Sequence, residues 1–156
     1  MKPYHYQIQL AKAIRSGKNI ILQAPTGAGK TFGALMPFFQ GWTNSNSNMP
    51  RKCVYAVPMR VLANQFTEEY DKFVKEQLRN VDVMHEISRQ TGEFREDPEF
   101  HCDITFATID QVLSSWLLRP YSLSKRKWNL NAGAFVGSYL IFDEFHLFDP
   151  DSTLPT

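Results

Sequence analysis

The stretch Ala24-Pro25-Thr26-Gly27-Ala28-Gly29-Lys30-Thr31 decides how the rest of the chain is interpreted. It follows an apolar run, Ile20–Gln23, which we predict to be the first strand, and it opens a helical pattern. A strand, a glycine-rich turn, Lys-Thr and a helix are the context of a phosphate-binding loop. Its backbone N–H groups can surround a polyphosphate, Lys30 would reach the β and γ phosphates, and the Thr31 hydroxyl would ligate Mg²⁺. The general pattern G-x-x-x-x-G-K-[ST] begins with glycine, where this chain has Ala24.

Composition limits the class of protein. The chain has 156 residues, 43% of them hydrophobic and 21% charged, which fits one globular domain. The net charge of +1 means that any nucleic-acid site must be a local patch. Cys53 and Cys102 lack metal-ligand spacing and are expected to be reduced thiols. The N-terminus has no apolar core of a secretory signal, and no apolar run approaches the ~20 residues of a membrane span. We therefore expect a cytoplasmic protein that does not bind membranes.

The order of elements predicts the fold class. Helical spacing of apolar residues predicts helices over 4–16, 29–42, 61–78 and 109–118, and apolar runs predict strands over 20–23, 52–57, 81–85, 103–108 and 138–142. The segment 86–100 is expected to be a polar, acidic connection, and 119–131 a basic loop. Strands that alternate with helices predict an α/β fold, with a mostly parallel sheet flanked by helices on both faces.

A second motif follows the last predicted strand, which delivers the two carboxylates of Asp143 and Glu144 at its C-terminal end. Asp143 is placed to hold Mg²⁺, and Glu144 to orient or deprotonate an attacking water. Alone, Asp-Glu after an apolar run is equally typical of a strand that meets a solvated turn. Because parallel sheets bind ligands at the carboxyl ends of their strands, the carboxylates and the glycine-rich loop together predict an ATP·Mg²⁺ site.

These motifs resemble the first motor lobe of superfamily 2 helicases. In that family the loop commonly reads Ala/Pro-Thr-Gly-x-Gly-Lys-Thr, so Ala24 is an accepted variant. Asp143-Glu144-Phe145-His146 resembles the D-E-x-H form of helicase motif II. The resemblance implies a RecA-like P-loop NTPase lobe in which His146 couples the nucleotide site to the nucleic-acid path. The alternative for His146 is a capping or surface role.

The pair Tyr6-Gln7, 23 residues before Lys30, resembles the adenine-reading glutamine motif of the same family. An amide can satisfy both a donor and an acceptor on the adenine edge, and Tyr4 or Tyr6 could stack on the base. Alternatively, Gln7 simply lies on the polar face of the first helix. Gln9 is a competing glutamine, but it lacks the preceding tyrosine.

Two strand-to-helix junctions resemble helicase motifs Ia and Ib. They are 58–65 (Pro-Met-Arg-Val-Leu-Ala-Asn-Gln) and 108–111 (Thr-Ile-Asp-Gln). The resemblance implies that they bind a nucleic-acid backbone through Pro58, Arg60, Gln65, Thr108, Asp110 and Gln111. Ordinary helix capping is the alternative for both. Thr91-Gly92-Glu93 resembles the small glycine motif between them. The basic run Lys125–Lys127, flanked by Tyr121 and Trp128, either grips nucleic acid or is a solvated loop.

The motif around Thr108, together with Ala-Gly-Ala-Phe-Val-Gly (132–137) leading into 140–149, is similar to the CRISPR-associated helicases of type I interference. This resemblance implies single-stranded DNA and a crRNA-guided effector complex as partners. The four histidines show no HD pair, and no nuclease domain fits before the phosphate loop, so we expect the HD nuclease to be a separate chain. The open alternatives are another superfamily 2 DNA or RNA helicase or translocase, such as a restriction or repair motor, and a catalytically silent nucleic-acid-binding module.

The sequence ends at Thr156, before the Ser/Thr-Ala-Thr motif III and the second lobe of this family. We therefore interpret 1–156 as the N-terminal part of lobe 1, with an incomplete sheet and poor ATP hydrolysis in isolation. In this fold the strand that leads to motif III lies between the phosphate-loop strand and the Asp-Glu strand. Its absence would leave backbone groups unpaired in the middle of the sheet.

Overall fold

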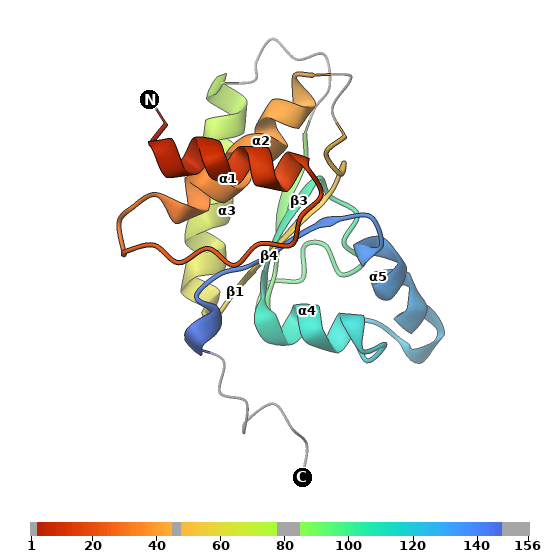
Figure 1. The fold of residues 1–156 in the computed structure, drawn as a ribbon. Coiled ribbons are helices and arrows are strands. Elements are labelled where there is room, and N and C mark those ends of the chain that lie inside the picture. The colour runs from red at the N-terminus through yellow and green to blue at the C-terminus, as the bar shows by residue number, and fades with distance from the viewer. Residues whose placement is uncertain (1–2, 45–47, 78–84, 148–156) are drawn as a thin grey trace. The chain divides into compact units, whose positions relative to one another are not determined.

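A computed structural model of the chain describes residues 3–44, 48–77 and 85–147 (Figure 1). These residues form two compact units, 1–51 and 52–156. Most of the predicted strand 81–85 lies outside the described residues, and His85 belongs to no strand. Among the described residues, no helix combines the length and apolar character needed to cross a membrane.

The first unit contains two helices, α1 (His5–Arg15) and α2 (Lys30–Trp42), joined by the phosphate-loop segment. Both helices were predicted, and both are confirmed. Helix α1 ends at Arg15, and Gly17, which follows the C-cap residue Ser16, has a φ of +72°, a left-handed conformation that glycine adopts without strain. The two helices pack closely at Gly33, where an added Cβ would come within 3.0 Å of Gln7 Cγ.

The predicted strand Ile20–Gln23 is wrong. The segment has no regular secondary structure, and Ile21 is 99% exposed. A strand is stable only when a neighbour pairs with its backbone N–H and C=O groups. No described strand pairs with 20–23, so its apolar sequence alone does not make it a strand.

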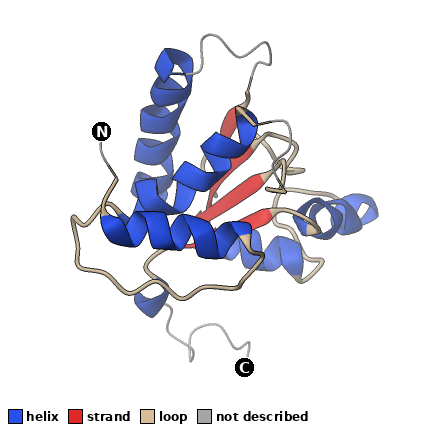
Figure 2. Cartoon of the chain, turned by 45° about the horizontal axis from the view of Figure 1, so that its top comes forward, coloured by secondary structure: helices blue, strands red, loops and turns tan. Residues whose placement is uncertain are grey.

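The second unit contains a four-stranded sheet, drawn in red in Figure 2. Its strands are β1 (Cys53–Val57), β2 (Ile87–Gln90), β3 (Ile104–Thr108) and β4 (Tyr139–Phe142). Their order is β2-β3-β1-β4, and every pair is parallel, with Tyr55 opposite both Phe106 and Ile141. The central strands β1 and β3 are completely buried, which explains their continuous apolar sequence. The predicted parallel α/β sheet is therefore confirmed.

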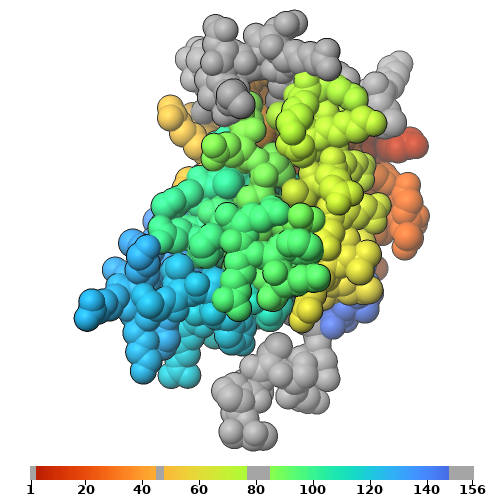
Figure 3. Space-filling view, turned by 180° about the vertical axis from the view of Figure 1, so that it is seen from behind, coloured from red at the N-terminus to blue at the C-terminus, as the bar shows by residue number. Residues whose placement is uncertain are grey.

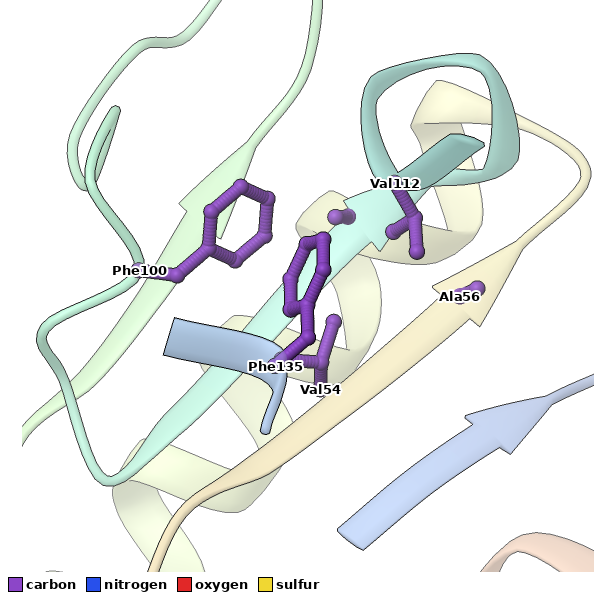
Figure 4. Packing of buried hydrophobic residues seen from close by; sticks show 6 residues of the cluster. Val54, Ala56, Phe100, Val112 and Phe135 are labelled. Atoms are coloured by element: carbon purple, nitrogen blue, oxygen red, sulfur yellow. The ribbon is translucent and has the colours of Figure 1, made fainter. Parts of the chain in front are cut away.

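Alternate residues of β1 face different helices. Tyr55 points toward α3 (Arg60–Gln77), where its ring packs against Phe66, and it also contacts Phe106 of the neighbouring strand β3. The opposite face is covered by α4 (Ile109–Trp116) and α5 (Trp128–Phe135). Its core cluster, shown in Figure 4, consists of Val54, Ala56, Phe100, Ala107, Val112 and Phe135. Seen from behind in Figure 3, α3, the 85–100 segment and the 115–135 segment lie side by side.

One strand and one α-helix of this unit were not predicted. Strand β2 lies where the sequence suggests a polar connection, because its alternate residues Ser88 and Gln90 are polar and yet buried. Ser88 is held by the hydroxyl of Thr105 and the carboxylate of Asp97. Helix α5 begins inside the predicted basic loop, directly after a short 3-10 turn, η1 (Lys125–Lys127).

Candidate functional site

The phosphate-loop segment forms a tight turn that depends on two glycines. Gly27 and Gly29 have φ values of +78° and +75°, and Gly29 is the N-cap of α2. Ala24 is not among the residues with positive φ, so the loop needs no glycine there. This explains in physical terms why Ala24 replaces the first glycine of the general pattern. Among the described residues, the N–H groups of Gly27 and Gly29 have no acceptor.

Two side chains of α1 hold consecutive carbonyl groups of the loop. The Tyr6 hydroxyl donates to Ala28 O at 2.6 Å, and Gln7 Nε2 donates to Gly29 O at 2.9 Å. The other amide atom of Gln7, Oε1, accepts from the Tyr4 N–H at 2.8 Å. Gln7 is only 3% exposed. It therefore does not lie on the polar face of the first helix, which was the alternative from sequence.

The charged residue of the loop folds back onto it, since Lys30 Nζ donates to Ala24 O at 3.2 Å. Thr31 follows in the first turn of α2 and is half-buried, whereas Pro25 and Thr26 are exposed. A helix N-terminus, backbone N–H groups, one lysine and one threonine together suit a polyphosphate with its divalent cation.

In the second unit, Asp143 directly follows β4 and is held by two groups of β1. Its N–H donates to Ala56 O at 2.9 Å, and its Oδ2 accepts from the Tyr55 hydroxyl at 3.0 Å. Sequence reasoning did not select Tyr55. The available signal was a tyrosine within a buried apolar strand, because a buried phenol needs a hydrogen-bond partner. Asp143 also contributes to the raised pKa of Tyr70, after burial and the charge of Glu69.

Glu144 has a strained backbone, with a φ of +47° that non-glycine residues rarely adopt. Its N–H donates to Asp143 Oδ1 at 2.9 Å, and its carboxylate lies 3.3 Å from Nδ1 of the exposed His146. His146 belongs to a 3-10 turn, η2 (Phe145–Leu147). Strain of this kind is concentrated at functional sites in proteins. Among the described residues, no group of three or more His, Cys, Asp or Glu side chains could hold a metal ion by itself.

The carboxyl ends of β2, β3 and β1 form one edge of the sheet, where α3 and α4 begin. Arg60, the first residue of α3, is exposed and packs over Gly92, where an added Cβ would be 3.4 Å from Nη2. Pro58 is half-buried, while Gln65 and Asp110 are exposed. This edge therefore carries the exposed guanidinium of Arg60 and the N-termini of α3 and α4.

Two of the predicted nucleic-acid residues are buried at the same edge. Thr108 is 4% exposed and Gln111 is 5% exposed. Thr108 is the N-cap of α4, but its hydroxyl makes no capping hydrogen bond, and Oγ1 has no partner in the described part of the chain. Side-chain capping, the alternative from sequence, is therefore not what Thr108 does.

Part of the basic run Lys125–Lys127 makes contacts within the fold. Lys127 Nζ lies 2.6 Å from Glu99 Oε1, and Trp128 Nε1 donates to Leu123 O. The hydrogen bond and charge of Lys127 lower the pKa of Glu99. Lys125 and Arg126 are exposed.

Comparisons with known proteins agree with the motifs. The sequence profile described as DEAD/DEAH box helicase matches residues 4–154. DEAD-box ATP-dependent RNA helicase 57 of Oryza sativa subsp. japonica is 29% identical over 92% of this chain and 24% of its own length. ATP-dependent DNA helicase Hel308 of Thermoplasma acidophilum is 28% identical over 98% of this chain and 20% of its own length. The putative CRISPR-associated nuclease/helicase Cas3 of Methanocaldococcus jannaschii is 28% identical over 95% of this chain and 21% of its own length.

The fold has a counterpart among solved structures. The DUF1998 helicase MrfA, solved with DNA and AMPPNP, superposes with a TM-score of 0.66 and 21% identity over 92% of this chain and 19% of that chain. The parallel sheet flanked by helices thus matches a RecA-like helicase lobe. The chain spans about a quarter or less of the length of these relatives. Because the family match extends over nearly all of its residues, the chain belongs to the DEAD/DEAH box helicases of superfamily 2.

Proposed function

We propose that this chain is the ATP-binding part of a helicase or translocase motor that moves on single-stranded DNA. The observation that carries the proposal is the loop between α1 and α2. It has two left-handed glycines whose N–H groups have no acceptor in the described part of the chain, and Lys-Thr at a helix start. Such a loop suits the phosphates of ATP. On binding, Lys30 would exchange the Ala24 carbonyl for phosphate oxygens, and Thr31 would offer its hydroxyl to Mg²⁺.

The carboxylates of the second unit fit the remaining roles. The Tyr55 hydroxyl holds the Asp143 side chain in one orientation, and a carboxylate oxygen is a ligand that suits Mg²⁺. Mg²⁺, when bound, would neutralise charge on the phosphate oxygens. Glu144 would orient the attacking water, and its contact with His146 supports a coupling role for that histidine. We therefore propose four catalytic residues: Lys30, Asp143, Glu144 and His146.

Adenine recognition is proposed for the start of α1. Tyr4 and Tyr6 are stacked with centroids 6.3 Å apart, and Tyr4 is 64% exposed, so its ring offers a surface for a base. Gln7 lies directly behind the loop and would read the adenine edge only by giving up one of its present hydrogen bonds.

The edge at the starts of α3 and α4 is proposed to bind the nucleic-acid backbone. Arg60 supplies charge, and the N–H groups of the two helix starts supply donors for phosphate oxygens. Pro58, Gln65 and Asp110 flank this surface, and the buried Thr108 and Gln111 would support it from beneath.

The motor is proposed to serve CRISPR type I interference in the cytoplasm, with a crRNA-guided effector complex and a separate HD nuclease as partners. Support comes from the sequence motifs after Thr108 and from the Cas3-named relatives, one of which, from Thermoproteus tenax, is 26% identical over 95% of this chain. The rice RNA helicase keeps an RNA motor as the second candidate.

The test is the ATPase rate of the full-length protein with poly(dT), poly(U) or no polynucleotide. We expect stimulation by poly(dT) and loss of hydrolysis in Lys30→Ala, while Lys18→Ala, an exposed lysine of the same unit, stays at the wild-type rate. Wild-type turnover in Lys30→Ala would refute the nucleotide role of the loop. Stronger stimulation by poly(U) would favour the RNA motor.

A further inference from the structure

We propose that the Tyr6 hydroxyl is a positioning group for the phosphate loop, which it holds in the shape that receives a polyphosphate. Together with Gln7, it fixes two consecutive peptide planes of the loop. The inference rests on the proposed nucleotide role of that loop and assigns Tyr6 a task that is separate from contact with the base.

The argument starts from peptide geometry. In a trans peptide the C=O of one residue and the N–H of the next point in opposite directions, and the described residues contain no cis peptide. Tyr6 draws the Ala28 carbonyl toward α1, and so the Gly29 N–H points away from α1. Gln7 Nε2 draws the Gly29 carbonyl to the same side, the Gly33 N–H also donates to this carbonyl at 3.0 Å, and so the Lys30 N–H also points away. Successive N–H groups on one side of a turn form an anion-binding concavity.

The glycine conformation makes this arrangement possible. Gly29 has φ +75° and ψ +38°, and helical Lys30 follows it. A left-handed residue before a right-handed one turns successive N–H groups to the same side. The hydrogen bonds from Tyr6 and Gln7 stabilise this conformation against rotation of the two peptides.

The two side chains are themselves fixed in position. Gln7 Oε1 is taken by the Tyr4 N–H, so that its Nε2 must face Gly29. An added Cβ at Gly29 would be 3.0 Å from Gln7 Nε2, so the Gln7 amide lies in close contact with Gly29. The Tyr6 hydroxyl reaches Ala28 O at 2.6 Å, and a phenylalanine in its place would keep the ring and lose only this bond.

The expected effect concerns every ligand that carries the phosphate chain. One net hydrogen bond corresponds to about a 3- to 10-fold change in an equilibrium constant. In Tyr6→Phe, the affinities for ATP, GTP and inorganic tripolyphosphate should therefore all fall by about the same factor, and the ratio of ATP to GTP affinity should not change.

The experiment measures the dissociation constants of these three compounds, with Mg²⁺, for the full-length protein. The matched control is Ser16→Ala, which removes another hydroxyl-to-carbonyl bond of α1, from Ser16 Oγ to Ala13 O at 2.8 Å, and should leave all three constants unchanged. Thermal melting of both variants checks that the fold is kept.

An equal loss of affinity for all three compounds in Tyr6→Phe supports the inference. Unchanged constants in Tyr6→Phe, or a loss for ATP with tripolyphosphate unaffected, would overturn it, and the latter result would assign the hydroxyl to the base. A wild-type protein that binds none of the three would instead overturn the proposed function of the loop.

Discussion

Substituting Gly29 by alanine tests the structure of the loop more sharply than removing its lysine. Two costs apply at Gly29. The first is its φ of +75°, which costs an L-residue about 1–2 kcal/mol, offset by about 0.4–1 kcal/mol because alanine restricts the unfolded chain. The second is the new Cβ, 3.0 Å from Gln7 Nε2, which would break a hydrogen bond worth about 0.5–1.5 kcal/mol.

Gly27 provides the matched comparison within the same loop. Its φ is +78°, but an added Cβ would meet nothing within 4 Å. Gly27→Ala therefore carries only the conformational cost. We expect Gly29→Ala to lower the free energy of unfolding by about 1 kcal/mol more than Gly27→Ala does.

The assay is urea unfolding followed by circular dichroism, with the slope of the transition checked for constancy. Repeating both substitutions in a Gln7→Ala background completes a double-mutant cycle. The difference between the two glycines should disappear there, because the side chain that meets the Cβ is gone. Equal costs in the wild-type background, or a difference that persists without Gln7, would refute the account.

Two further predictions concern buried polar groups of the second unit. In Asp97→Asn we expect a loss of about 2–3 kcal/mol at neutral pH in the free energy of unfolding, since an amide cannot accept the His101 and Cys102 N–H bonds of 2.7 and 2.9 Å as well as a carboxylate does. Burial raises the pKa of Asp97, but these bonds outweigh it and lower that pKa overall. The stabilisation by the Asp97 carboxylate is therefore present above its unfolded-state pKa and is lost as the pH falls through its folded-state pKa. The free energies of unfolding of variant and wild type, measured by urea titration, should converge in acid. A difference that stays constant with pH would contradict this account. In Tyr55→Phe, Asp143 loses its phenolic donor, and we expect a roughly 10-fold lower ATPase rate at saturating ATP; an unchanged rate would contradict the orienting role.

The elements that were predicted correctly from the sequence are those with a simple pattern of apolar residues, either a continuous run or a helical repeat. Strands β1 and β3 are continuous apolar runs because both of their faces are buried, and α3 repeats apolar residues at helical spacing because one side packs on the sheet. Strand β2 was not predicted because the side chains that it buries, Ser88 and Gln90, are polar. Ser88 is compatible with burial only because the Asp97 carboxylate and the Thr105 hydroxyl lie beside it, and neither contact is visible from local sequence.

The candidate site shows the same difference between features that local sequence determines and contacts that depend on the packing of distant segments. The motif predicted where the loop and the carboxylates lie in the chain, because glycine conformation and strand ends are local properties. The sequence motifs did not predict that Tyr6 and Gln7 donate hydrogen bonds to carbonyl groups 22 residues away. They also did not predict that Tyr55 orients Asp143, 88 residues away. Those contacts depend on how the helices and strands pack. The opposite error was Ile20–Gln23, where local sequence favoured a strand that has no described neighbour to pair with.

Burial also changes what the motif-Ib residues can contribute to nucleic-acid binding. The Thr108 hydroxyl is buried and has no hydrogen-bond partner among the residues that the structure describes, so it cannot be the group that first meets a phosphate. The N–H groups at the start of α4 remain the donors of that segment, and the exposed carboxylate of Asp110 beside them repels phosphate. In the proposed complex with a nucleic acid, the positive charge of the exposed Arg60 would offset the negative charge of Asp110. It follows that the charge of Arg60, more than the hydroxyl of Thr108, should determine how steeply the affinity for DNA falls with salt.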